Sequence, residues 1–235
     1  MEPIFFGRSA HLFGIFHPNV AAVSRGAVVV APPLLTENIR THYACREVSM
    51  GLSRSGFDVL RFDFSACGDS HGNFAGLRVD DWVRDLEDAA SELKDLTGLN
   101  QLSVFSVRFS AALAAASSKN IRWDSIVMWD PILDGPAWVE QIEYVRSLLK
   151  RGDLAEPYEY LGEPCGPEFA QSLSAFEKPG ISARRVVAII TDGEPETESH
   201  WDCRKLDFDS NWRQPFTENL FSHQVIDETI KVFTE

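Results

Sequence analysis

The chain has 235 residues, 44% of them hydrophobic, which is enough for one substantial core, so we expect a single domain over residues 1–235. Its formal net charge of −13 argues against a nucleic-acid partner or an anionic-membrane surface, since both need basic patches. The longest apolar run, near residues 26–35, is too short to cross a bilayer, which takes about 20 residues, so no membrane span is expected.

Strands and helices are predicted to alternate along the chain. Short apolar or β-branched runs predict strands at residues 12–17, 26–31, 58–64, 102–106, 125–129 and 186–191. Helical spacing of apolar residues predicts helices at residues 42–55 and 79–96, from residue 111 onward, and at residues 223–233. Continuous apolar strands separated by helices predict the α/β class, with a mostly parallel sheet covered by helices on both faces.

Residues 135–182 differ in character from the rest of the chain. They carry several prolines and many acidic residues and lie between two predicted strands. Side chains such as Trp138 and Ile142 are typical of packing positions, which argues against a flexible linker. We therefore expect a small lid inserted within the domain.

The cysteines and the absence of targeting signals indicate a cytoplasmic protein. The missing phosphate loop and metal cluster indicate that it has no cofactor. The four cysteines are widely spaced and form no C-x-x-C pair, which favours reduced thiols. The N-terminus lacks a basic segment followed by an apolar stretch, so no signal peptide is expected. No glycine-rich phosphate loop appears, and the group His200, Asp202 and Cys203 lacks the second cluster that a zinc site needs. We expect neither a nucleotide nor a metal.

The turn after strand 102–106 carries the most informative residue. Ser106-Val-Arg-Phe-Ser110 lies between that strand and a helix of small residues. A strand, a sharp turn and a helix of small residues are the setting of the nucleophile elbow G-x-S-x-G. When the segment is aligned with this motif, Arg108 occupies the position of the serine. Ser106 and Ser110 occupy the positions of the two glycines. A guanidinium stays protonated and has no acceptor lone pair, so Arg108 cannot attack a carbonyl.

Three further segments follow predicted strands in a fixed order. They are Ala31-Pro-Pro-Leu-Leu-Thr-Glu37, Arg61-Phe-Asp-Phe-Ser-Ala-Cys-Gly-Asp-Ser-His-Gly72 and Met128-Trp-Asp-Pro-Ile-Leu-Asp-Gly135. Together with the elbow, this series resembles α/β-hydrolases of the serine-aminopeptidase-like group. More narrowly, it resembles the exosortase-A-associated hydrolase-like proteins of bacterial gene clusters. The resemblance covers most of residues 3–150.

The resemblance implies a set of site residues in this chain. The backbone N–H of Phe109 and one near Leu34 would be the oxyanion donors. The acid would be Glu194 or Asp192, and the histidine before the last helix would be His223. The sequence departs from the family pattern in lacking both elbow glycines and a visible loop between His223 and that helix.

Arg108 requires an anion nearby, because an unpaired buried charge is costly. One interpretation is a buried salt bridge to Glu37, Asp130 or Glu194. Another is a clamp for a ligand anion, since a helix N-terminus next to Arg108 also favours negative charge. A third interpretation is catalytic, with Arg108 as an electrophile that stabilises negative charge on the reacting oxygen. Among nearby nucleophiles, Ser106 and Ser110 are expected to hydrogen-bond locally, and Cys67 would need a cationic neighbour.

Three functions remain open from the sequence. The first is a protein with a degenerate elbow that binds a small acyl or carboxylate-containing molecule, with Leu34, Glu37, Phe109 and Ser110 at the site. The second is an ester or thioester hydrolase or acyltransferase that uses a non-standard nucleophile or an activated water, with His223 as base. The third is a non-catalytic partner of biosynthetic enzymes. A homo-oligomer is compatible with each of them.

Overall fold

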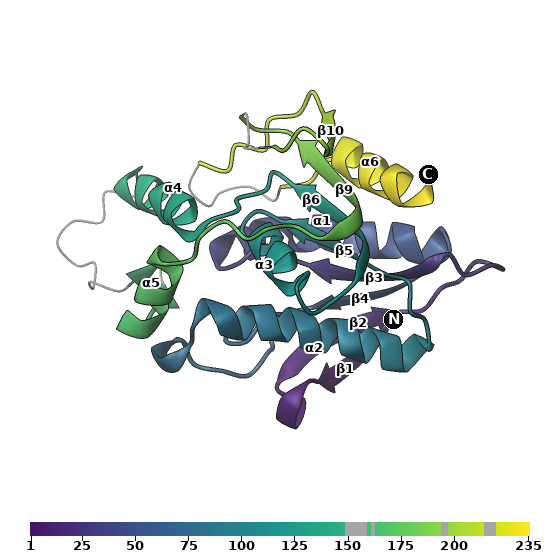
Figure 1. Cartoon of the computed structure of the whole chain (residues 1–235), viewed down its shortest axis with the longest axis horizontal. Helices are drawn as coiled ribbons and strands as arrows, with labels where there is room; N and C mark the ends of the chain where they lie inside the picture. Colours follow the sequence, from purple (N-terminus) through teal and green to yellow (C-terminus); the bar gives the residue numbers. More distant parts are fainter. Residues whose placement is uncertain (149–158, 161–162, 194–196, 214–219) are drawn as a thin grey trace.

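A computed structural model describes residues 1–148, 159–160, 163–193, 197–213 and 220–235, and an eight-stranded sheet forms its centre (Figure 1). The strand order is β1-β2-β4-β3-β5-β6-β9-β10. β1 pairs antiparallel with β2, and β2 with β4, whereas the remaining neighbours run parallel. The bounds are β1 Glu2–Phe6, β2 Leu12–His17, β3 Gly26–Ala31, β4 Phe57–Phe62, β5 Leu102–Val107, β6 Trp123–Trp129, β9 Ala183–Ile190 and β10 Asp202–Lys205.

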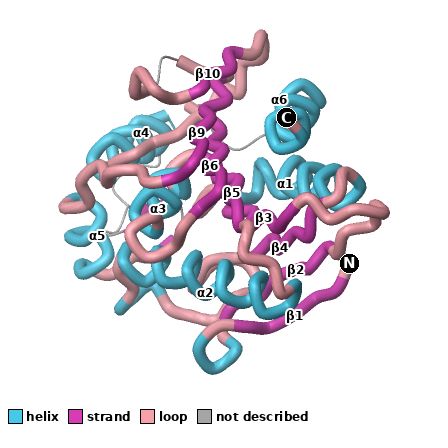
Figure 2. Tube along the Cα trace, turned by 45° about the vertical axis from the view of Figure 1, so that its right-hand side comes forward, coloured by secondary structure: helices cyan, strands magenta, loops and turns pink. Residues whose placement is uncertain are grey.

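Helices cover both faces of this sheet, as predicted (Figure 2). α1 (Thr36–Arg54) and α6 (His223–Thr234) pack on one face, and α2 (Val79–Thr97) and α3 (Ser110–Ser117) on the other. β3 illustrates why: all six residues are buried, with Val28 and Val30 facing α1 while Ala27 and Val29 face α2. The continuous apolar run in the sequence therefore reflects burial on two sides.

The segment predicted as a lid contains α4 (Gly135–Leu148), the two-stranded pair β7 (Glu159–Tyr160) and β8 (Glu163–Pro164), and α5 (Pro167–Ser174). Trp138 of α4 and Phe169 of α5 belong to the core on the α2 side. Gly135 N donates to Phe176 O at 2.8 Å, which joins the start of α4 to the residues after α5. These helices are thus built into the domain; that they act as a lid stays a prediction.

The structure differs from the sequence prediction at the start of α1 and at two edge strands. α1 begins at Thr36 rather than at residue 42. The sequence does not predict its first turn, because that turn lacks an apolar stripe and Ile39 there is 73% exposed. The edge strands β1 and β10 lie outside the predicted strands, because neither is a continuous apolar run and both keep exposed residues. Two short 3₁₀ helices, Arg8–Ala10 and Phe74–Gly76, complete the described elements.

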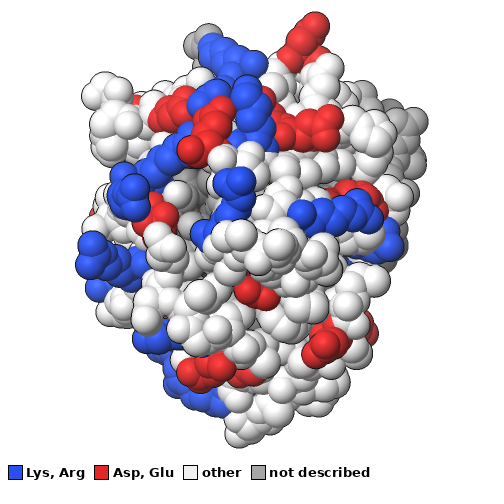
Figure 3. All heavy atoms as spheres, turned by 90° about the vertical axis from the view of Figure 1, so that its right-hand side faces the viewer, with Lys and Arg blue, Asp and Glu red and all other residues white. Residues whose placement is uncertain are grey.

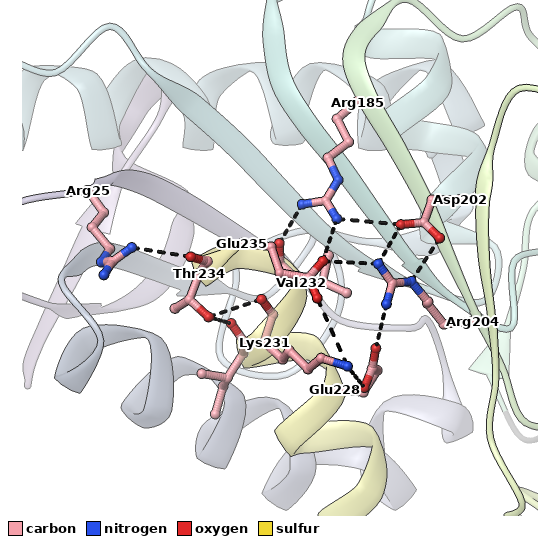
Figure 4. A network of polar contacts seen from close by, with 10 residues as sticks. Arg25, Arg185, Asp202, Arg204, Glu228, Lys231, Val232, Thr234 and Glu235 are labelled. Carbon is pink, nitrogen blue, oxygen red and sulfur yellow. Dashed lines mark hydrogen bonds and ion pairs between the residues drawn. The ribbon is translucent and has the colours of Figure 1, made fainter.

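Basic side chains gather on the face that carries the C-terminal end of α6 (Figure 3). Helix C-termini expose carbonyls with partial negative charge, which Lys and Arg offset. Arg185 Nη1 donates to Val232 O at 2.6 Å and Arg25 Nη1 to Thr234 O at 3.3 Å, both in the last turn of α6 (Figure 4). Arg185 and Arg25 therefore stabilise the C-terminal end of α6.

In the described part of the chain no helix is both long and apolar enough to span a membrane.

Replacing Gly135 by alanine tests the close approach between α4 and α5. A Cβ at this position would collide with the backbone oxygen of Leu173, so we expect a loss of about 1–3 kcal/mol in unfolding free energy, as for an overpacked core. Gly76→Ala is the matched control, because a Cβ there meets nothing within 4 Å. Urea denaturation followed by circular dichroism measures both. Equal stability of the two variants would contradict this packing.

Candidate functional site

Arg108 lies at the tip of the turn between β5 and α3, in the position that the sequence predicts. Its φ of 57° is left-handed, a conformation that costs a non-glycine residue about 1–2 kcal/mol. Backbone contacts hold it there: Arg108 N donates to Trp129 O at 3.0 Å, while its carbonyl accepts from Ala111 N at 3.0 Å and Ile132 N at 3.3 Å. The sharp elbow forms without either glycine.

Ser106 and Ser110 stabilise this turn and are fully buried. Ser110 Oγ contacts the oxygens of Ala31 at 3.0 Å and Val107 at 2.7 Å and accepts from Val107 N at 3.0 Å. Ser106 Oγ points to Val127 O at 3.5 Å. Both hydroxyls hydrogen-bond to the backbone, as predicted for residues that replace the elbow glycines.

The Arg108 guanidinium turns inward and is only 5% exposed. Nε donates to Glu37 Oε1 at 3.0 Å, Nη1 to Asp130 O at 3.2 Å and Nη2 to Gln141 Oε1. The guanidinium carbon lies 4.7 Å from the ring centroid of Trp212, within cation–π range. Four separate segments of the chain thus hold one positive charge.

Glu37 is the anion of this site. It lies in the first turn of α1, where the helix dipole favours negative charge, and its side chain is 14% exposed. Its second oxygen, Oε2, is buried without a hydrogen-bond partner among the described residues. The buried salt bridge that the sequence offered as one interpretation of Arg108 therefore forms with Glu37, while Asp130 contributes its backbone oxygen.

A narrow cavity of about 20 Å³ lies beside the Glu37 side chain. It has room for about one water molecule. Its lining residues come from the start of α1, from α4 and from the segment before α6: Leu34, Leu35, Thr36, Glu37, Arg40, Trp138, Gln141, Ile142, Val145 and Trp212. Phe109 does not line it; its ring is fully buried and stacks on Trp138 with centroids 4.6 Å apart.

Asp130 and Trp212 are site residues whose roles the sequence analysis missed. The Asp130 carboxylate is 2% exposed and accepts from Thr191 N at 2.7 Å, from Thr191 Oγ1 and from Asp192 N at 3.2 Å. Trp212 Nε1 donates to Asp130 Oδ2 at 2.7 Å. Asp130 directly follows β6 in one of the quoted motifs, which was an available signal. Trp212 lies in an irregular segment with no periodic pattern, so only the fold locates it.

The remaining predicted residues lie in different places. His223 begins α6, is exposed, and packs its ring against Phe221 at 4.8 Å; it neither contacts Arg108 nor lines the cavity. Asp192 is half-buried and reaches Asp130 through its backbone N–H. Glu194 lies outside the described residues. The part of the chain that the structure describes contains no group of three or more side chains placed to hold a metal.

The indole N–H of Trp212 can be tested by Trp212→Phe. The phenyl ring keeps an aromatic face near Arg108 but leaves the buried Asp130 carboxylate one donor short, so we expect a loss of about 1–3 kcal/mol in unfolding free energy. Trp201→Phe is the control, because Trp201 is 6% exposed and its Nε1 has no partner among the described residues. Chemical denaturation compares them, and a larger loss in the control would refute the assigned bond.

Comparison with known proteins supports the architecture. No family model matches the sequence, and no curated protein matches it. The solved structure of Est1E from Butyrivibrio proteoclasticus has a TM-score of 0.64 at 10% identity, over 99% of this chain and 97% of that one. A putative hydrolase from Agrobacterium vitis gives 0.63 at 13% identity, over 100% and 98%.

A third solved structure is described as an α/β serine hydrolase without a lid. This protein from Xanthomonas campestris gives a TM-score of 0.57 at 17% identity, over 94% of this chain and 86% of that one. Identities this low establish architecture rather than activity, because one scaffold hosts many chemistries. The chain has the α/β-hydrolase fold.

Proposed function

We propose that this protein is a non-hydrolytic member of the α/β-hydrolase fold that binds a small carboxylate-bearing acyl molecule at Arg108. One observation carries the proposal: the residue at the elbow is a guanidinium that already holds a carboxylate, with Arg108 Nε 3.0 Å from Glu37 Oε1. Glu37 is then an internal occupant of the anion site, and a ligand carboxylate takes its place.

The chemistry of the side chains argues against serine hydrolysis. Arg108 offers no lone pair, and the indole N–H of Trp212 beside it is a donor only, so neither can act as nucleophile or general base. The Ser106 and Ser110 hydroxyls are hydrogen-bonded to backbone oxygens inside the core. A carbonyl group at this site would find cationic and N–H donors but no serine hydroxyl to attack it.

The surroundings favour a ligand with an acyl chain. Leu34, Ile142 and Val145 give the narrow cavity an apolar wall next to the charged pair. Burial of each methylene against such a wall contributes about 0.8 kcal/mol, and a cavity of about 20 Å³ favours a ligand with a short chain. In this proposal the backbone N–H of Leu34, which lines the cavity, adds a neutral donor for the ligand oxygens.

The absence of hydrolysis has a direct chemical test. Wild-type protein treated with a fluorophosphonate probe and with short p-nitrophenyl esters should remain unlabelled and should not turn the esters over. Intact-mass measurement followed by peptide mapping gives the readout, with an active serine esterase as the positive control. A covalent adduct on Ser106 or Ser110 would overturn the non-hydrolytic assignment.

Carboxylate binding is tested with Glu37→Ala, which removes the internal occupant. Acetate, propionate and butyrate, at constant ionic strength, should raise the melting temperature of this variant more than that of the wild type. At a ligand concentration of 100 Kd the stabilisation is about 2.7 kcal/mol. The variant Glu37→Ala with Arg108→Met should not respond, and butanol should not replace butyrate. Absence of any shift in Glu37→Ala would rule out the anion site.

A further inference from the structure

Arg108, Trp212 and Asp130 form a chain of contacts that joins three loops at one edge of the sheet. Arg108 follows β5, Asp130 follows β6, and Trp212 lies between β10 and α6. The Trp212 ring lies between the other two, with its centroid 4.7 Å from the guanidinium carbon and its Nε1 2.7 Å from Asp130 Oδ2.

The order of these contacts matches that of a serine hydrolase triad. There, a nucleophile at the elbow touches a histidine ring, and the other ring nitrogen donates to a buried carboxylate that orients it. Here an elbow residue touches an aromatic ring, and the ring N–H donates to a buried carboxylate. We infer that Trp212 stands at the general-base position and Asp130 at the acid position of a hydrolase site. In such a site Arg108 replaces the nucleophile and Trp212 replaces the base, so neither of these two steps of ester hydrolysis can take place.

Asp130 retains what an orienting carboxylate needs. Donors from the end of β9 fix it independently of Trp212: Thr191 N at 2.7 Å and Asp192 N at 3.2 Å contact Oδ1. Oδ2 is the oxygen that receives the indole N–H. A histidine at position 212 would direct one ring N–H to this oxygen, which fixes the tautomer and leaves the other ring nitrogen free to accept a proton.

The elbow is also formed. The left-handed φ of 57° at Arg108 and the helix that starts two residues later present a side chain at the tip of the turn, with backbone N–H groups behind it. Replacing Arg108 by serine places a hydroxyl there and removes the guanidinium that fills the site. Glu37 would then lack its partner, so Glu37→Gln is added to remove its charge.

The repaired site has a defined reaction with a fluorophosphonate. The oxygen of the serine introduced at position 108 bonds to phosphorus, fluoride leaves, and the hydroxyl proton passes to the ring nitrogen of the introduced histidine that does not contact Asp130. Asp130 orients the ring throughout and gains no proton. With a p-nitrophenyl ester, the same oxygen bonds to the acyl carbon, p-nitrophenolate leaves, and water then hydrolyses the acyl-enzyme.

The decisive comparison uses two variants that differ only at position 212. Arg108→Ser/Glu37→Gln/Trp212→His should be labelled by the probe at position 108 at least about 100-fold faster than Arg108→Ser/Glu37→Gln, the usual lower bound for general-base catalysis. Its labelling rate should rise with pH near the titration of an imidazole, at about 6–7. A folded triple variant that labels no faster than its control would overturn the inference.

A second measurement avoids the loss of Arg108. The single variant Trp212→His should show a strongly downfield ring N–H proton resonance from its bond to Asp130, and Asp130→Asn in that background should shift the resonance upfield. Absence of this signal in a folded protein would equally contradict the assignment. Because neither experiment uses a carboxylate ligand, their failure would leave the proposed binding function standing.

Discussion

The buried guanidinium of Arg108 is the constraint on which the rest of the site depends. A charge at 5% exposure is stable only with partners, since desolvation in the protein interior is costly. Those partners are the Glu37 carboxylate, the Asp130 carbonyl, the Gln141 amide and the Trp212 ring. They belong to α1, the loop after β6, α4 and the segment before α6, so one side chain connects the structural parts that an α/β-hydrolase would arrange around its substrate.

Strained backbone conformations also occur around Arg108. Leu35, Arg108 and Asp130 have φ values of 54°, 57° and 41°, and all three border the site although none is glycine. Such conformations cost on the order of 1–3 kcal/mol each and persist where surrounding contacts enforce them. The backbone of an elbow and its neighbouring loops is therefore present, with a guanidinium rather than a hydroxyl or thiol at its tip. The fold is that of hydrolases, whereas the loss of hydrolase chemistry at the elbow stays a proposal.

Much of this architecture could be predicted from the sequence. β3 is a continuous apolar run because both of its sides are buried, and α2 shows a clear stripe because one side faces solvent. The position of Arg108 at the elbow also follows from local pattern, as does its pairing with one of a few carboxylates. An edge strand such as β1 is not predicted in this way, because three of its five residues are exposed and it has no continuous apolar run.

The polar contacts across the site could not be predicted in the same way. Trp212 lies 82 residues from Asp130, and its segment has no repeat or motif, so only the assembled sheet brings the two together. The role of His223 as a base stays a prediction; the structure places it at the exposed start of α6. The acid after the penultimate strand, Asp192 or Glu194, stays a prediction. The structure buries the Asp130 carboxylate at the end of that strand, where Thr191 N and Asp192 N donate to it, although Asp130 itself follows the preceding strand in the sequence.

The most direct test of this account is the hydrogen exchange of the Arg108 Nε–H, followed by ¹⁵N NMR and assigned by comparison with Arg108→Lys. A guanidinium held between Glu37 and Trp212 should give a resolved Nε–H signal that is shifted by the indole ring current. Its proton should exchange with water at least about tenfold more slowly than those of exposed arginines, because buried groups are protected from exchange. An Arg108 Nε–H that exchanges as fast as those of surface arginines and shows no ring-current shift would mean that the side chain does not fill the site.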